Sequence, residues 1–427
     1  MGARGPTTEV LPMYRTHIKS ITLCAALLAS CAAGAIAPVR AEAPAASTTR
    51  LPAEVRGLWV VRSSITSAQS IKNIVATAKS HNFNTLFVQV RGRGDAYYKS
   101  HFEPRAEELD NAPANFDPLQ TMIDVAHANG LQVHAWMNTC YVWGDTKLPH
   151  AADHVLNAHP DWIDRDSSGQ YHLGKGKDCE GAFLSPANLD ARRHIHDVFL
   201  DVVRNYDVDG IHFDYVRYPC AAYDYSQASR TRFAAEMDTT LDPTQLARVH
   251  TAQKTDPYVY QHWFPGHFQD FRRRQVTEMV QSISHDAKQI KPGLLVSAAV
   301  FADFDDAYKL RGQDWKTWLQ NGYVDAVAPM AYGTSTARVS AQIADAVQCA
   351  HASGRMVFAG IGAWHIPVAS TVEKIAAARS LGADGEVLFS YGGVTKDGTT
   401  SAYLDKVTAS CFAKQALLPR TVRTAKL

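Results

Sequence analysis

One carboxylate within an apolar run is the first candidate for a catalytic residue. In residues 208–219 (VDGIHFDYVRYP), apolar and polar side chains alternate until a proline stops the run, which predicts a strand. Asp214 lies in this strand with His212 on the same face, and Arg217 follows three residues later. A buried carboxylate is costly unless it is paired or used. Asp214 therefore either pairs with Arg217 or Arg91 or acts in catalysis, and its place near a strand end favours catalysis.

Hydrolysis of a glycosidic bond is a chemistry that such a carboxylate can perform, and it requires a second carboxyl. Candidates lie in the loops after other predicted strands: Asp95, Glu180, Asp303, Asp305 and Asp306. Asp303 is preferred slightly over Asp95 because it lies two residues beyond its strand. The predicted catalytic residues are Asp214, Asp303 and Asp95.

The elements that must position these residues alternate regularly along the chain. The predicted strands are residues 57–63, 85–91, 132–138, 208–219, 294–301, 326–332, 356–361 and 386–391. The predicted helices are residues 68–80, 118–129, 189–205, 268–291, 315–321, 339–352, 372–381 and 401–412. Eight strand–helix units predict an α/β fold of the (β/α)8 TIM-barrel type, with function at the carboxyl ends of the strands. A doubly wound sheet is disfavoured because no glycine-rich phosphate loop follows the first strand.

Two connections in this pattern are longer than a simple link. Residues 140–188 follow the third predicted strand and residues 220–266 follow the fourth, so both leave from the functional face of a barrel. Both are rich in Tyr, Trp and His, whose rings can stack on sugars or simply pack the loops onto the barrel. We expect these connections to form substrate-binding walls or lids.

Polar and aromatic side chains recur where the predicted strands end, as expected for a catalytic cup. The residues predicted to bind or orient substrate are Gln89, Arg91, His134, Trp136, Asn138, His212, Arg217, Tyr218, Tyr332, Trp364 and Tyr391. Two alternatives stay open. Gln89 and Arg91 could instead form a polar layer inside the barrel. His134 and His212 could be core histidines that orient Asp214.

The first forty-odd residues have the pattern of an export signal. Basic residues precede an apolar run at 21–29 that is shorter than the about 20 residues of a membrane span. The run leads into LASC (28–31), which is similar to a lipobox, so we expect a lipid on Cys31 and a periplasmic protein anchored in the outer membrane. Ordinary signal cleavage after Ala41 is the alternative. The predicted domains are a leader and tether (1–49), the barrel (50–415) and a C-terminal tail (416–427).

The composition of the chain limits the classes of partner that we expect it to bind. The formal net charge is +1, with no run of like charges, so nothing indicates nucleic acid or a polybasic membrane surface. The seven cysteines contain no CxxC pair, and no motif supports a metal site. We expect a monomer without metal or cofactor that contacts the membrane only through its lipid. Export permits disulfides, and the predicted pairs are Cys349–Cys411 and Cys179–Cys220.

Several short motifs follow one another in a definite order. They are RGLW (56–59), FVQVRGRGDAYY (87–98), HAWMN (134–138), HPDW (159–162), LSP (184–186), DGIHFDY (209–215), APMAY (328–332) and FSY (389–391). Together they resemble the bacterial glycosyl-hydrolase-like family ten over residues 54–394. The resemblance implies an exported, often lipid-anchored TIM-barrel enzyme that hydrolyses cell-wall glycan, notably peptidoglycan strands stripped of peptide. By position it implies these site residues: Gln89, Arg91, Asp95, His134, Asn138, Asp214 and Tyr332.

The sequence also departs from the patterns it resembles. Tyr215 stands where family members often have a second acidic residue, so the proton-transfer partner of Asp214 must lie elsewhere. The chitinase pattern D-G-x-D-x-D-x-E is matched only in part, with His212 and Val216 in place of Asp and Glu, which disfavours chitinase-like chemistry. We expect an exported glycoside hydrolase that cleaves a cell-wall polysaccharide with paired carboxylates. A catalytically inactive carbohydrate-binding barrel and a metal-dependent polysaccharide deacetylase are the alternatives.

Overall fold

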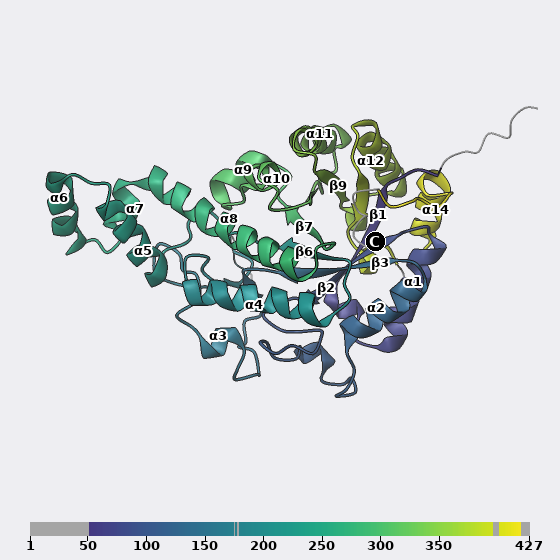
Figure 1. Cartoon of the computed structure of the whole chain (residues 1–427), viewed down its shortest axis with the longest axis horizontal. Helices are drawn as coiled ribbons and strands as arrows, with labels where there is room; N and C mark the ends of the chain where they lie inside the picture. The colour runs from purple at the N-terminus through teal and green to yellow at the C-terminus, as the bar shows by residue number, and fades with distance from the viewer. Residues whose placement is uncertain (1–50, 175, 177–178, 396–400, 420–427) are drawn as a thin grey trace, which may run out of the picture. The chain divides into compact units, whose positions relative to one another are not determined.

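A closed barrel of eight parallel strands forms the centre of the fold (Figure 1). The computed structural model describes residues 51–174, 176, 179–395 and 401–419. The strands follow the order β1-β10-β9-β8-β7-β6-β3-β2 around the barrel. Their bounds are β1 Val55–Val60, β2 Thr85–Arg91, β3 Gln132–Asn138, β6 Gly210–Asp214, β7 Leu295–Val300, β8 Ala326–Pro329, β9 Met356–Ile361 and β10 Gly385–Leu388. The predicted TIM barrel is confirmed.

Helices follow the strands and cover the outside of the barrel (Figure 1). They are α1 Ala68–Ser80, α2 Pro118–Ala128, α4 Leu189–Asn205, α8 Pro265–Ile290, α10 Trp315–Gln320, α11 Thr336–Ala352, α12 Val368–Ser380 and α14 Ala402–Cys411. Several begin at side chains that accept hydrogen bonds from the free amides of the first turn: Ser67 caps α1, Asp117 caps α2 and Asn188 caps α4. Local sequence therefore fixes where these helices start.

Five barrel strands are shorter than the sequence pattern predicts, namely β1, β6, β7, β8 and β10. β6 ends at Asp214, β8 at Pro329 and β10 at Leu388. After β6, Tyr215 has a φ of 49°, a left-handed conformation that breaks extended backbone. After β10, Tyr391 begins the short helix α13 (Tyr391–Val394) rather than ending a strand. The apolar runs continue past the strands because these turns are buried as well.

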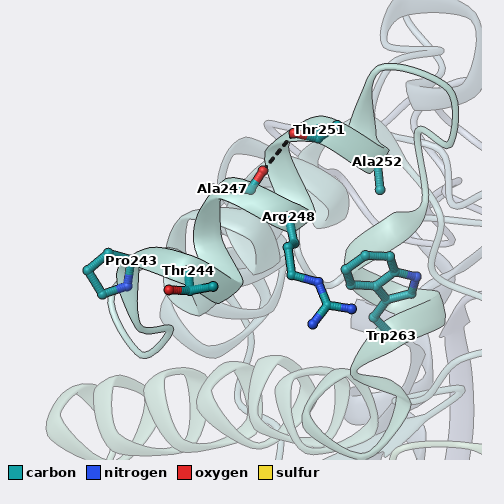
Figure 2. A pocket seen from close by; sticks show the side chains of 7 residues that line it. All are labelled: Pro243, Thr244, Ala247, Arg248, Thr251, Ala252 and Trp263. Carbon is teal, nitrogen blue, oxygen red and sulfur yellow. Dashed lines mark hydrogen bonds between the residues drawn. The ribbon is translucent and has the colours of Figure 1, made fainter.

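The connections after β3 and β6 carry secondary structure of their own. The first contains the antiparallel pair β4 (Tyr141–Trp143) and β5 (Ala182–Phe183) and the short helix α3 (Val155–Ala158). The second, here called the insert, contains α5 (Gln227–Asp238), α6 (Pro243–Gln253) and α7 (Val259–Trp263). Figure 1 shows α6 and α7 near one end of α8, away from the barrel strands, and Figure 2 shows Trp263 of α7 beside α6. The insert packs on α8 through its own hydrophobic cluster, which includes Phe233, Phe268 and Phe271.

Two histidines lie inside the barrel among aromatic rings. The Trp59 indole donates a hydrogen bond to His212 Nε2 (3.3 Å), so His212 Nδ1 carries the proton and donates to Ser297 Oγ (2.8 Å). Burial lowers the pKa of His212 well below its ordinary value, and it lowers the pKa of His134 to about 4. Both side chains are therefore neutral members of the core at physiological pH.

The two predicted disulfides are not formed. Cys179, Cys220, Cys349 and Cys411 all carry free thiols, and the Cys179 thiol donates to the Gly181 carbonyl (2.9 Å). Sequence spacing alone does not determine which cysteines meet. Over the ranges that the structure describes, no helix is long and apolar enough to cross a membrane. The predicted leader, Cys31 and residues 420–427 of the tail lie outside the described residues.

Candidate active site

A cavity of about 690 Å³ opens at the carboxyl ends of the barrel strands, and we call it the cup. Its size is that of a small-ligand site, and it lies where the sites of TIM-barrel enzymes lie. The lining residues are Trp59, Val61, Arg62, Gln89, Trp136, Asn138, Tyr141, Glu180, Asp214, Tyr215, Arg217, Ala299, Phe301, Met330, Tyr332, Trp364 and Phe389. Its charged side chains are two arginines and two carboxylates.

Asp214, the last residue of β6, presents its carboxyl group to the cup. The Trp136 indole donates a hydrogen bond to Oδ2 (3.0 Å), and the Tyr215 amide donates to Oδ1 (2.7 Å). The left-handed turn at Tyr215 allows its amide to point back at this carboxyl. Burial raises the pKa of Asp214, and this effect outweighs the opposing influence of Arg217 and the two N–H donors. Asp214 therefore keeps its proton to a higher pH than an ordinary aspartic acid.

Arg217 connects Asp214 to a second carboxylate in the cup. Its Nη1 lies 3.5 Å from Asp214 Oδ1, and its Nη2 donates to Glu180 Oε2 at 3.2 Å. The guanidinium lies 4.0 Å from the centre of the Tyr215 ring and 5.0 Å from that of Phe301. Only 3% of the side chain is exposed, so the arginine is held in one place between the two carboxyls.

Glu180 comes from the long connection after β3 and is much more accessible than Asp214. Its side chain is 46% exposed, against 8% for Asp214. The next residue, Gly181, has a φ of 146°, and a Cβ there would lie 2.0 Å from the Trp143 carbonyl oxygen. Glycine is thus required where β5 approaches β4, and this approach brings Glu180 over the cup.

Aromatic rings form one wall of the cup. Tyr332 packs edge-on against Trp364 (5.1 Å between ring centres) and Trp59 (6.3 Å). Phe389 lies 5.3 Å from Trp364 and 6.2 Å from Trp136. Trp364 is 44% exposed, so its ring is open to a ligand. Such a wall suits the apolar faces of sugar rings.

Gln89 and Asn138 form a polar patch beside this wall. Gln89 donates to Asn138 Oδ1 (3.3 Å) and accepts from Arg62 Nη1 (3.2 Å), while Asn138 Nδ2 donates to the Gly92 carbonyl (2.8 Å). All three side chains line the cup, so the amides and the guanidinium can meet sugar hydroxyls. The structure therefore brings seven predicted site residues together: Asp214, Gln89, Trp136, Asn138, Arg217, Tyr332 and Trp364.

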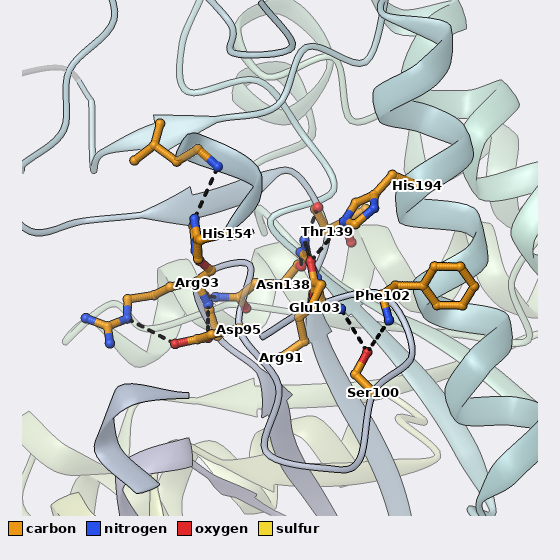
Figure 3. Close-up of polar contacts among 12 residues, drawn as sticks. Arg91, Arg93, Asp95, Ser100, Phe102, Glu103, Asn138, Thr139, His154 and His194 are labelled. Atoms are coloured by element: carbon orange, nitrogen blue, oxygen red, sulfur yellow. Dashed lines mark hydrogen bonds and ion pairs between the residues drawn. The ribbon is translucent and has the colours of Figure 1, made fainter. Parts of the chain in front are cut away.

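Arg91 and Asp95 lie outside the cup, in the polar cluster of Figure 3. Arg91 is buried and donates three hydrogen bonds to Glu103, at 3.0, 2.8 and 2.6 Å, and two more to the carbonyls of Asn138 and Thr139. Asp95 is buried too, and it accepts from the Arg93 amide (2.8 Å). These side chains hold the loop after β2 in place, and neither lines the cavity.

The structure does not bring five further predicted residues into the cup. His134 and His212 lie in the barrel interior, Tyr218 is buried against Arg272 (4.3 Å), and Tyr391 is buried at the start of α13. Asp303 is exposed and caps α9 (Phe304–Leu310) by accepting a hydrogen bond from the Asp306 amide (3.2 Å). The sequence already indicates this role, because an aspartate directly before a segment with helical apolar periodicity is a typical N-cap.

The cup also contains residues outside the predicted set, namely Trp59, Val61, Arg62, Tyr141, Glu180, Tyr215, Ala299, Phe301, Met330 and Phe389. Tyr141 and Glu180 come from the long connection after β3, where no spacing rule shows which side chains return to the barrel. Within the described residues, no three His, Cys, Asp or Glu side chains are grouped so as to hold a metal ion.

Solved structures show the same architecture at low sequence identity. The glycoside hydrolase domain of PgaB (BpsB) from Bordetella bronchiseptica has a TM-score of 0.57 and 17% identity, covering 80% of this chain and 95% of that one. A GH42 β-galactosidase from G. stearothermophilus has a TM-score of 0.60 and 12% identity, covering 84% and 56%. These likenesses show the fold, which is that of TIM-barrel glycoside hydrolases.

Sequence comparisons give the family. Glycosyl hydrolase DigH of Escherichia coli (strain K12) is 25% identical over 363 residues, covering 72% of this chain and 73% of that protein. Glycosyl hydrolase YngK of Bacillus subtilis (strain 168) is 25% identical over 276 residues, covering 58% and 46%. The model of one family, glycosyl hydrolase-like 10, matches residues 54–375. The chain belongs to the glycosyl hydrolase-like 10 family.

Proposed function

We propose that the protein is a glycoside hydrolase in which Asp214 is the general acid and Glu180 is the base or nucleophile. The observation that carries this proposal is the contact of both carboxyls with one guanidinium, that of Arg217. The two contacts and the width of the guanidinium keep the facing carboxylate oxygens within about 9 Å of each other. Paired carboxyls of glycosidases lie roughly 5 to 9.5 Å apart.

The environment of Asp214 supports the acid role. Its raised pKa favours the protonated form, which can give a proton to the glycosidic oxygen of the leaving group. Loss of that proton leaves a carboxylate facing the Trp136 N–H, the Tyr215 N–H and Arg217. These donors are already in position, so they stabilise the charge without rearrangement.

Glu180 has the properties of the partner. It is half-exposed, so water reaches it, and it forms an ion pair with Arg217. An ionised carboxylate there can activate a water molecule or attack the sugar directly. The aromatic wall with Trp364 supports stacking of a sugar ring, and Gln89 and Asn138 supply amides for hydroxyl groups.

The proposed substrate is a cell-wall polysaccharide, peptidoglycan strands that have lost their peptides. This part of the proposal rests on the motif resemblance described above. It requires an exported protein, and we propose that export leaves it in the periplasm with a lipid on Cys31 holding it to the outer membrane.

Product release from purified glycan strands tests the proposal. Peptide-free and peptide-bearing strands are incubated with the wild type, Asp214→Asn, Glu180→Gln and the matched control Asp303→Asn, and the products are identified by mass spectrometry. Loss of a catalytic carboxyl is expected to reduce turnover about 10²- to 10⁴-fold. Asp303→Asn should retain turnover because its carboxylate only caps α9. Retained turnover in Glu180→Gln together with a loss in Asp303→Asn contradicts the assignment of the pair.

The same assay separates the two alternatives. Binding of strands by the wild type without any product indicates a carbohydrate-binding barrel. Release of acetate that stops on chelation, with the strands left whole, indicates a metal-dependent deacetylase.

A further inference from the structure

The insert stands on the same side of the barrel as the cup. In a (β/α)8 barrel the helices run antiparallel to the strands, so the first residues of α8 lie at the carboxyl face. α8 has 26 residues and its neighbour α4 has 17, a difference of about 14 Å of helix. The extra turns of α8 carry α5, α6 and α7 outward, as Figure 1 shows.

Two surface hollows in the insert share the side chains of Arg248 and Trp263. The first has a volume of about 680 Å³ and is lined by Pro243, Thr244, Ala247, Arg248, Thr251, Ala252 and Trp263 (Figure 2). The second, of about 400 Å³, adds Gln245, Val249 and Phe264. Figure 2 shows the Arg248 guanidinium beside the Trp263 ring. A single extended ligand that occupied both hollows would therefore pass over these two side chains.

Trp263 is one of the few open aromatic rings of the protein. Of eight tryptophans, only Trp263 (46%) and Trp364 (44%) are exposed, and Trp364 belongs to the cup. A single exposed apolar side chain is ordinary on a protein surface. Trp263 differs because it lines two hollows whose other lining residues include the polar side chains of Thr244, Gln245, Arg248 and Thr251. Thr251 uses its hydroxyl hydrogen on the Ala247 carbonyl (2.8 Å), which leaves its oxygen able to accept.

Arg248 gives the hollows a positive charge that no described side chain neutralises. Among the described residues it is the only charged group lining either hollow, and no described carboxylate pairs with it. Acidic residues of the insert are engaged elsewhere: Glu236 pairs with Arg274, Asp238 accepts from Tyr260, Asp242 caps α6, and Asp256 accepts from His262 (2.8 Å). The cup differs, because there two carboxylates face the arginines.

We propose that the hollows beside Trp263 and Arg248 form a second binding subsite for a carboxylate-bearing glycan, with a sugar ring on Trp263 and the carboxylate on Arg248. Peptide-free peptidoglycan carries a free lactyl carboxylate on alternate sugars, so its strands offer both the sugar ring and the carboxylate that this subsite would bind. That choice of strand rests on the proposed function. The preference for a carboxylated sugar rests on the hollows alone.

The test measures binding of three full-length proteins in an Asp214→Asn background, which prevents consumption of the ligand. The first carries no further change, the second carries Trp263→Ala and the third carries Arg248→Gln. The probes are peptide-free peptidoglycan strands and the same strands with their carboxyls reduced to alcohols. Exposed side chains at the far end of the barrel helices give the controls Ile290→Ala and Arg204→Gln. Melting curves and Trp263→Phe, which retains a ring, distinguish a lost contact from a misfolded insert.

Trp263→Ala is expected to weaken binding of both probes about tenfold, and Arg248→Gln to weaken binding of the carboxylated probe alone about fivefold. The Arg248 effect should diminish at high salt. Unchanged affinity in both variants overturns the inference, as does an equal effect of Arg248→Gln on the two probes, or failure of the intact protein to bind. Binding with these effects but no cleavage by the wild type refutes the proposed hydrolase and leaves the subsite standing.

Discussion

Replacing Glu103 with glutamine is expected to destabilise the fold without removing any group from the cup. The Glu103 side chain is 1% exposed and accepts from Arg91 Nε (2.8 Å) and Nη2 (2.6 Å), and His194 lies 3.3 Å away (Figure 3). Arg91 is itself fully buried. Glutamine keeps the shape of the side chain but leaves the arginine charge in the interior without a counter-charge.

The size of the effect follows from the pKa of Glu103. Burial acts to raise this pKa, but the charge and hydrogen bonds of Arg91 and His194 lower it from 4.5 to about 2. A shift of this size corresponds to about 3 kcal/mol of stability, close to the roughly 3–5 kcal/mol lost when one partner of a buried pair is removed. Because the pKa is lowered by folding, this stability is present above pH 4.5 and is lost as the pH falls toward 2.

Urea unfolding at pH 7 gives the free energies of unfolding of the wild type and Glu103→Gln. The two are compared with the same m-value, the slope of that free energy against urea concentration. Asp190→Asn is the control, because its pair with Arg193 is 64–70% exposed and contributes less than about 1 kcal/mol. Between pH 4.5 and 2 the wild type should lose more stability than the variant. The kcat and KM of the folded variant should stay within about twofold of the wild type. A stability loss below about 1 kcal/mol, or a large rise in KM with unchanged stability, refutes the view that Arg91 supports the fold rather than binds substrate.

Three further predictions concern the cup and the leader. Arg217→Gln removes a charge that holds the Asp214 pKa down, so the alkaline limb of the pH profile of kcat/KM should move to higher pH while the maximal rate falls. Gly181→Ala should reduce turnover at least about tenfold, because its Cβ would lie 2.0 Å from a carbonyl oxygen of β4, whereas Gly266→Ala, with no atom within 4 Å of its Cβ, should leave turnover unchanged. Cys31→Ala should move the protein from the membrane fraction to the soluble fraction, and an unchanged distribution would contradict the lipid anchor.

The proposed subsite bears on how a strand reaches the cup. In the cup two carboxyl groups lie beside the two arginines, so the positive charge of the arginines is partly balanced there. Among the described residues, Arg248 has no carboxylate beside it in the hollows, so in the proposed subsite it would attract a negatively charged strand without taking part in the chemistry. Separating the two functions would let the cup keep Asp214 and Glu180, the pair proposed for catalysis.

The order of strands and helices in the barrel can be predicted from the amino-acid sequence alone. The short apolar runs and the helical segments between them gave the order of all eight units, because strands of a parallel barrel are buried on both faces and each helix buries one apolar face. The same pattern also placed Asp214, Trp136 and Asn138 at strand ends, since the carboxyl ends of parallel strands meet at one face. The ends of strands, such as the turn at Tyr215, do not follow from this pattern, because a turn can be as buried as the strand before it.

Which polar side chains line the cavity depends on tertiary contacts. Arg91 and Asp214 both lie at strand ends, but Arg91 is bound by Glu103 of the following loop, whereas Asp214 faces the cavity. Asp303 is bound to its own helix as a cap, and Glu180 reaches the cup from a connection of nearly fifty residues. These outcomes depend on contacts between residues far apart in the chain. Local periodicity carries no information about such contacts, because it records only which face of each element is buried.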